Sequence, residues 1–307
     1  MMSPTILILI HYTFLCIMML IAVGFFSLIE RKVLSLIHSR VGPDKVSLSG
    51  ILQPIADALK LMTKDDFPVA WSNFILFYAS PILMFSVSLG TFLIFPFFMG
   101  GSQSFSMILL MIFLGMTVYG NLISGWSSNS KYALIGSVRS VSQSLSYEVV
   151  FSFFMILIIS VMATFDICKF YVMHLTMLGL MSTFIVLMFI SVALAELNRT
   201  PFDLSEGESE LVSGYSVEYG GVMYTLLFLS ENVSIFMSCF MISFFFFSKS
   251  PWVFPLMWSV WAFILCVLRG ALPRLRYDVL MQFCWLSLLP SVLLSFNFIL
   301  VMIVVIY

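Results

Sequence analysis

Charged residues are scarce in this sequence. Its 307 residues include 14 basic and 15 acidic side chains, or 9% of the chain, whereas 61% of the residues are hydrophobic. Because a soluble domain carries about 25% charged residues, this composition excludes a soluble globular protein. The net charge of −1 and the lack of any basic block also exclude nucleic-acid binding. The mean hydropathy of +1.10 predicts a protein embedded in a lipid bilayer.

Motifs for metals, nucleotides and redox cofactors are also missing. The five cysteines are dispersed through apolar sequence without a C-x-x-C pair, and the three histidines are too far apart to share a metal ion. No G-x-G-x-x-G motif and no P-loop occurs. We therefore expect no metal site and no bound cofactor, so any redox centre must belong to a partner protein.

Long apolar runs are abundant, and they predict an all-α integral membrane protein with about eight transmembrane helices. A helix satisfies its own backbone hydrogen bonds inside lipid and needs about 20 residues to cross it. The predicted spans are Ile6–Ile29, Phe74–Met99, Phe105–Ile123, Leu145–Phe165, Leu175–Ala195, Val222–Phe247, Trp252–Leu268 and Met281–Tyr307. Since no soluble segment separates them, we expect residues 1–307 to form a single multi-pass domain.

The charged residues lie mostly on one side of the predicted membrane. Of the 14 basic residues, 12 fall in or beside the loops after the first, third, fifth and seventh spans. The positive-inside rule places these loops on the cytoplasmic or matrix side and both termini on the other side. All acidic residues except Asp166 belong to the same loops or to the adjoining helix ends, so we expect one face to carry the chemistry.

Residues Gly50–Asp65 have the pattern of an amphipathic helix. The apolar stripe comprises Ile51, Leu52, Ile55, Leu59 and Met62, and the polar face comprises Gln53, Asp57, Lys60 and Lys64. Two interpretations are open. The helix floats at the bilayer interface, or it forms the wall of a cavity that a lipid-borne substrate reaches from the membrane.

The segment Glu196–Glu218 is strongly acidic, with Arg199 as its only base. Its acidic residues are Glu196, Asp203, Glu206, Glu208, Glu210 and Glu218. The pair Thr200 and Pro201 has the pattern of a helix start, and a helix there would bring three of these carboxylates onto one face. Crowded carboxylates repel one another, so we expect at least one to hold a proton near neutral pH. The alternative is a solvated acidic loop.

Two acidic residues lie within the predicted spans. Glu148 is near the start of the fourth span and Glu231 is about ten residues into the sixth. A charge at mid-helix costs about 2.5–3.5 kcal/mol on insertion scales, which makes such acids candidates for function. Serines at helical spacing accompany both acids, and we weigh a proton path against a buried structural hydrogen bond. We expect the arginines Arg139, Arg269, Arg274 and Arg276 to pair with the acidic loop, and Asp278 belongs to the charged cluster before the last span.

Five segments together resemble a known family. They are Glu30–Pro43, Gly50–Asp65, Ser128–Val149, Ala195–Tyr219 and Pro273–Met281. In this order they are similar to subunit 1 of NADH:ubiquinone oxidoreductase, respiratory complex I, and they cover every predicted inner loop. The sequence departs from the usual residues of that family at His38, Ser47, Asp65 and Leu286.

The resemblance implies a core membrane subunit that forms the ubiquinone chamber with partner subunits and couples quinone reduction to proton translocation. Ubiquinone is the implied substrate, and NADH, FMN and the iron–sulfur clusters are implied in partner subunits. The implied surroundings are the mitochondrial inner membrane and its lipids, the other membrane-arm subunits and the peripheral quinone module. The charged loops would face the matrix, and both termini would face the intermembrane space.

The resemblance also assigns roles to individual residues. For the quinone chamber and the path into it, it implies Arg31, Arg40, Asp57, Lys60, Arg199, Asp203 and Arg274. For proton coupling, it implies Glu148, Glu196, Glu206, Glu208, Glu210, Glu218 and Glu231, with Arg139, Arg276 and Asp278 as charged partners. No catalytic residue is implied in this chain.

Two other classes of protein remain open. Intramembrane acids and an acidic inner loop also suit a stand-alone proton- or sodium-coupled secondary transporter. Such a transporter would show repeated or broken helices and would work without partners, yet no internal repeat is seen. The related subunit of a membrane-bound hydrogenase, which uses no quinone, is the third alternative.

Overall fold

The described part of the chain is entirely helical. The computed structural model describes residues 4–69, 71–95, 104–167, 183–203, 214–247 and 253–306. Its longer helices are α1 (Pro4–Ile37), α2 (Gln53–Met62), α3 (Phe74–Leu93), α4 (Ser106–Ser127), α5 (Lys131–Met162), α7 (Thr183–Glu196), α9 (Gly221–Phe247), α10 (Val253–Ala271) and α12 (Leu289–Ile306). Short pieces are η1 (Leu48–Gly50), η3 (Gly214–Ser216), α11 (Tyr277–Gln282) and the π-helical η4 (Phe283–Leu288). The predicted all-α class is confirmed.

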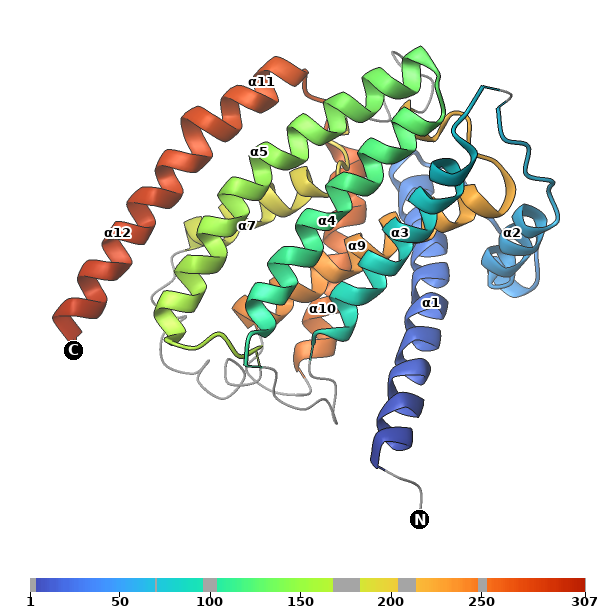
Figure 1. Cartoon of the computed structure of the whole chain (residues 1–307). Coiled ribbons are helices and arrows are strands. Elements are labelled where there is room, and N and C mark those ends of the chain that lie inside the picture. The colour runs from blue at the N-terminus through green and yellow to red at the C-terminus, as the bar shows by residue number, and fades with distance from the viewer. Residues whose placement is uncertain are drawn as a thin grey trace.

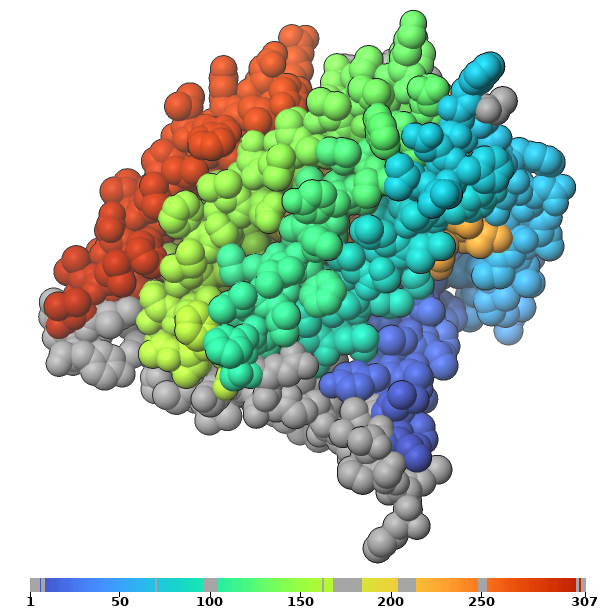
Figure 2. All heavy atoms as spheres, viewed as in Figure 1, coloured from blue at the N-terminus to red at the C-terminus, as the bar shows by residue number. Residues whose placement is uncertain are grey.

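The helices pack as one bundle around α5, α7 and α9. Helix α3 packs against α4 and α9, α4 packs against α5, and α5 packs against α7 and α12 (Figure 1). The largest fully buried side chains include Tyr147, Phe151 and Phe154 of α5, Phe189 of α7 and Phe245 of α9. Figure 2 shows α3, α4, α5 and α12 side by side on one face of the molecule. An aromatic core therefore joins helices that are far apart in the sequence.

Seven helical stretches in the described ranges are long and apolar enough to cross a membrane. They match seven of the eight predicted spans. The predicted span Leu175–Ala195 is described only from Thr183 onward, where α7 is a 14-residue apolar helix. Many large apolar side chains point outward, including Ile75 at 85% and Leu294 at 70% exposure. In a bilayer such side chains meet lipid instead of water.

Some predicted boundaries are wrong at the polar ends of the helices. Helix α5 begins at Lys131, not near Leu145, so Arg139 lies within a helix and not in a loop. Helix α1 continues to Ile37, beyond the predicted end at Ile29. The apolar run stops where the lipid stops, but serine, glutamine and lysine allow a helix to continue into water. Hydropathy therefore locates the bilayer more closely than it locates the helix ends.

The predicted amphipathic helix exists as α2, preceded by the 3₁₀ turn η1. Its apolar stripe is open to the surroundings, with Leu59 and Met62 each 59% exposed. Helix α2 lies beside α1 at the edge of the bundle (Figure 1). The first residues of α1 and the last residues of α12 lie at one end of the bundle, and α11 and the start of α5 lie at the opposite end (Figure 1).

Candidate functional site

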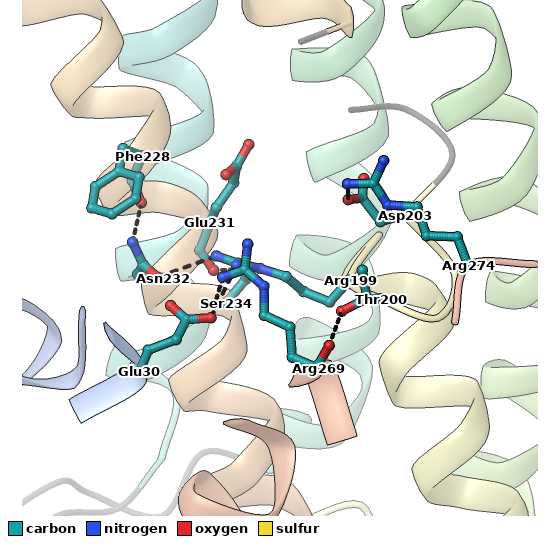
Figure 3. Close-up of polar contacts among 10 residues, drawn as sticks. All are labelled: Glu30, Arg199, Thr200, Asp203, Phe228, Glu231, Asn232, Ser234, Arg269 and Arg274. Carbon is teal, nitrogen blue, oxygen red and sulfur yellow. Dashed lines mark hydrogen bonds and ion pairs between the residues drawn. The ribbon is translucent and has the colours of Figure 1, made fainter. Parts of the chain in front are cut away.

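A buried ion-pair cluster joins α1, α10 and the turn that follows α7. Glu30 of α1 is 8% exposed and accepts hydrogen bonds from two guanidinium groups. Arg199 Nη1 lies 3.3 Å from Glu30 Oε1, and Arg269 Nη1 donates to the same oxygen (Figure 3). Two cations around one buried carboxylate compensate its desolvation, so the three side chains depend on one another. We call Glu30, Arg199, Arg269 and Asn232 the Glu30 cluster.

Asn232 of α9 completes the cluster. Its side-chain oxygen accepts a hydrogen bond from Arg199 Nη2 at 3.3 Å, and its Nδ2 donates to the carbonyl of Phe228 at 2.8 Å (Figure 3). Thr200 Oγ1 donates to the carbonyl oxygen of Arg269 at 3.4 Å. The guanidinium of Arg199 is therefore oriented from two sides by groups on α1 and α9.

The turn after α7 brings Arg199 into this position. Asn198 adopts φ of 50°, a left-handed conformation that asparagine tolerates at helix ends. Its backbone N–H still donates to the carbonyl of Ala195 at 3.3 Å, and the N–H of Phe202 donates to the carbonyl of Arg199 at 2.7 Å. Residues 200–202 form a turn and a bend. The predicted helix start at Thr200 and Pro201 is therefore wrong.

The turn is also held from outside. The N–H of Leu275 donates to the carbonyl of Pro201 at 3.0 Å. Arg274 Nη2 lies 3.4 Å from Asp203 Oδ2, and the Asp203 side chain is only 7% exposed (Figure 3). The prediction that arginines of the 269–276 region pair with the acidic segment is confirmed for Asp203.

A polar cavity of about 80 Å³ lies between α3, α4, α7 and α9. Its wall includes the acidic residues Glu196 and Glu231 and the basic residue Arg199. Each water needs about 10–15 Å³ of such space, so the cavity can hold several. Within the described ranges, the buried oxygens Asn121 Oδ1 and Asn198 Oδ1 of its wall have no hydrogen-bond partner in the protein.

Glu231 has the polar surroundings that its sequence predicts. Ser234 and Ser238 of α9 line the same cavity, and their hydroxyls donate to carbonyls of their own helix at 2.7 Å. Tyr215 of η3 donates its phenolic proton to Glu231 Oε1. Glu231 is thus connected to the C-terminal part of the acidic segment, which begins in the described ranges at Gly214.

That segment is tightly packed against the bundle. Gly214 has φ of 61°, and a Cβ on Gly136 of α5 would lie 2.9 Å from its Cα. Tyr219 stacks on Phe77 at 4.2 Å between ring centroids, and its hydroxyl lies 3.0 Å from Ser80 Oγ and 3.2 Å from Ser127 Oγ. Burial raises the pKa of the Tyr219 phenol. Glu218, next to it, is half-buried.

Glu148 lies in a second and more open cavity. It is half-buried on α5 and borders an apolar groove of about 400 Å³ between α4 and α5. Gly115 of α4 faces it, since a Cβ there would lie 2.5 Å from Glu148 Oε1. The carboxylates of Glu148 and Glu196 are near enough to repel each other electrostatically.

A third polar group joins α1 to α2. Arg31 Nη1 lies 2.5 Å from Asp57 Oδ2, and Gln53 Nε2 donates to Asp57 Oδ1 at 2.8 Å. Gln53 and Asp57 are half-buried, whereas Arg31, Arg40 and Lys60 are exposed. The pair fixes the polar face of α2 toward α1.

The structure thus gathers only some of the predicted site residues. Glu196, Arg199 and Glu231 share one cavity, and Asp203 and Arg274 lie beside the same turn. Arg139 lies half-buried in α5, and Arg276 and Asp278 are exposed at the start of α11. Glu206, Glu208 and Glu210 lie outside the described residues, so their predicted roles and their shared helix face stay predictions.

Three residues of the site were not singled out from the sequence. They are Glu30, Asn232 and Tyr215. Glu30 was visible as the first charged residue after the first apolar run, and Asn232 as a polar neighbour of Glu231. Their pairing with Arg199 could not be seen, because Glu30 and Arg199 are 169 positions apart. In the described ranges, no group of three histidine, cysteine or acidic residues could hold a metal ion.

The fold and the site together define a multi-pass α-helical membrane protein with charged and polar groups buried in its interior. A family model described as NADH dehydrogenase matches residues 10–302. A protein of Apis mellifera ligustica named NADH-ubiquinone oxidoreductase chain 1 is 40% identical over 94% of this chain and 95% of its own length. A protein of the same name from Mytilus edulis is 42% identical over 88% of this chain and 90% of its own length. The one from Locusta migratoria is 40% identical over 97% of this chain and 95% of its own length. The chain belongs to the NADH dehydrogenase family.

Proposed function

We propose that this chain is a core membrane subunit of a proton-translocating NADH:ubiquinone oxidoreductase in the mitochondrial inner membrane. The family and the names of its relatives support this. In this proposal the chain helps to form the ubiquinone chamber and passes the result of quinone reduction to proton movement. NADH, FMN and the iron–sulfur clusters belong to partner subunits on the matrix side, toward which the charged loops face.

The observation that carries the proposal is the polar cavity. Two acidic residues, Glu196 and Glu231, line it together with Arg199 inside a bundle of apolar helices. Buried acids are expensive in a membrane, and a cavity that holds water allows protons to move between them. Glu148 extends the row of acids toward the α4–α5 groove through its electrostatic interaction with Glu196.

The quinone part of the proposal rests on α2 and its surroundings. The exposed apolar stripe of α2 suits contact with an isoprenoid tail or with lipid. The polar face is tied to α1 through Arg31 and Asp57, and we assign these residues, with Arg40 and Lys60, to the path by which ubiquinone enters. Arg199, Asp203 and Arg274 are assigned to the chamber and to its link with the acidic loop.

The test is Glu231→Gln in the assembled complex, with Asp44→Asn as the control. Asp44 is an exposed acid in the loop after α1 and has no part in the cavity. We expect normal assembly but fewer protons translocated per electron in the Glu231 variant, and no change in the control. An unchanged ratio and rate in Glu231→Gln would refute the coupling role. Proton or sodium transport by the isolated chain in liposomes would instead establish the secondary transporter.

A further inference from the structure

Gln143 of α5 holds the turn after α7 at two points. Its Nε2 donates to the carbonyl of Ala195 at 2.9 Å and to the carbonyl of Phe202 at 2.9 Å. Ala195 is the residue before the end of α7 at Glu196, and Phe202 precedes Asp203, so a single side-chain amide spans the whole turn. The side chain is 0% exposed, which keeps water from competing for either carbonyl.

The turn held in this way carries three of the charged side chains discussed above. Glu196 follows Ala195 directly, Asp203 follows Phe202 directly, and Arg199 lies between them. Two of them have a charged partner on another part of the chain: Arg199 meets Glu30 of α1 at 3.3 Å, and Asp203 meets Arg274 at 3.4 Å. The third, Glu196, lines the polar cavity. A shift of the turn would therefore disturb all three together.

Gln143 suits this task better than a hydroxyl or a charged side chain would. An amide nitrogen has two hydrogens, so it can serve two carbonyls at once. A lysine could also do so, but it would bring a positive charge next to the Glu30 cluster. The rings of Tyr147 and Phe202 lie 6.3 Å apart, and both residues are buried, as Gln143 is.

We propose that Gln143 is a positioning residue that fixes the turn Ala195–Phe202 in the shape that presents Glu196, Arg199 and Asp203 to their partners. This inference rests on the proposed function, in which these three side chains serve quinone chemistry and coupling. Gln143 itself touches neither substrate nor a moving proton.

The test compares Gln143→Met with Gln282→Met in the assembled complex. Methionine has nearly the volume of glutamine but donates no hydrogen bond. Gln282 is an exposed residue of α11, so its replacement by methionine is the same chemical change at a position that does not contact the turn. NADH oxidation by a soluble acceptor that is reduced upstream of the quinone measures how much complex has assembled.

The first measurement is amide hydrogen exchange in the peptide that covers residues 195–203. We expect faster exchange in Gln143→Met and unchanged exchange in Gln282→Met. Equal exchange rates in the two variants would overturn the proposal, because the turn would then not depend on the amide. This readout involves no quinone, so it does not depend on the proposed function.

The second measurement is ubiquinone reduction in a double-variant cycle with Asp203→Asn. We expect Gln143→Met to lower kcat/KM for ubiquinone about 10-fold, since two buried carbonyls lose their donor, and to add little in the Asp203→Asn background. Fully additive losses would overturn the proposal. If exchange rises while ubiquinone reduction is unchanged in both single variants, Gln143 still fixes the turn, but the proposed function of the turn is overturned.

A second variant covers the case in which Gln143→Met does not assemble. Gln143→Glu keeps the size of the side chain, and its neutral form donates one hydrogen bond instead of two. We expect exchange and ubiquinone reduction between those of the wild type and those expected for Gln143→Met. Wild-type values for both would overturn the proposal.

Discussion

Replacement of Glu30 by glutamine tests how strongly the Glu30 cluster holds the bundle together. Glu30→Gln keeps the size and one oxygen acceptor but removes the negative charge that faces Arg199 and Arg269. The side chains of Glu30 and Arg199 are 10% and 15% exposed, so the guanidinium charge of Arg199 is poorly hydrated after the change. Breaking a buried ion pair from one side costs about 3–5 kcal/mol.

The lower end of this range applies, because the Arg269 side chain is 34% exposed and water can solvate it. We therefore expect a loss of about 3 kcal/mol of stability. At roughly 2–4 °C per kcal/mol for a large domain, the midpoint of thermal inactivation falls by about 6–12 °C. The measurement is the fraction of NADH:ubiquinone activity that survives a series of heat steps in native membranes, relative to the unheated sample.

The matched control is Asp57→Asn, which breaks the exposed pair with Arg31. The side chains of that pair are 48% and 32% exposed, and such pairs contribute roughly 0.2–1 kcal/mol, or about 4 °C at most. Glu30→Gln combined with Arg269→Met leaves one unpaired cation fewer and should be more stable than Glu30→Gln alone. If Glu30→Gln lowers the midpoint no more than Asp57→Asn does, the reasoning about the buried cluster is refuted.

Three further substitutions have outcomes that the structure fixes. Gly115→Ala places a Cβ 2.5 Å from Glu148 Oε1, so the carboxylate must turn away. The number of protons translocated per electron should drop, while the amount of complex on native gels stays normal. An unchanged number of protons per electron would contradict the assigned role of Glu148. Gly136→Ala brings a Cβ to 2.9 Å from the Gly214 backbone and should lower the stability by about 1–3 kcal/mol. The control is Gly220→Ala, where nothing lies within 4 Å of the added atom. Less complex should assemble with Gly136→Ala than with this control. Tyr219→Phe keeps the stack on Phe77 but loses the hydroxyl contacts to Ser80 and Ser127, and should cost about 1 kcal/mol. The pKa of Tyr219 in the folded chain is raised above 10.0. The neutral phenol therefore contributes fully to stability below about pH 10, and this contribution is lost only as the pH rises further. The thermal midpoint of Tyr219→Phe should be lowered equally at about pH 6 and pH 8.

The spans could be predicted from the sequence because lipid imposes a simple rule on each segment by itself. The apolar runs from Phe74 onward are helical where the structure describes them, and α2 formed at its amphipathic pattern. The same rule could not find the start of α5 at Lys131, since the polar end of that helix lies beyond the apolar run. It also misread Thr200 and Pro201, where local capping signals favoured a helix and the contacts of Gln143, Leu275 and Arg274 hold a turn.

The site was predicted by residue type more than by arrangement. Acids in an apolar sequence are costly wherever they fall, so Glu231 and Glu148 could be recognised one at a time. The family resemblance added Arg199 and Asp203. Neither approach indicated that Glu30 would be the shared partner of Arg199 and Arg269, or that Gln143 would bridge Ala195 and Phe202.

The sequence by itself determined that the chain lies in a lipid bilayer, that it is all-α, where most of its spans lie and which family it belongs to. Each of these depends on composition, on apolar runs within one segment or on motifs in their order along the chain. The tertiary structure alone decided which charges neutralise one another and which acids share a cavity. Glu30, Arg199, Asn232 and Arg269 come from four separate parts of the chain, and their ion pairs exist only where helix packing excludes water and brings these side chains within hydrogen-bond distance. The few charged residues marked a membrane protein at once, but their partners became known only when the helices were packed.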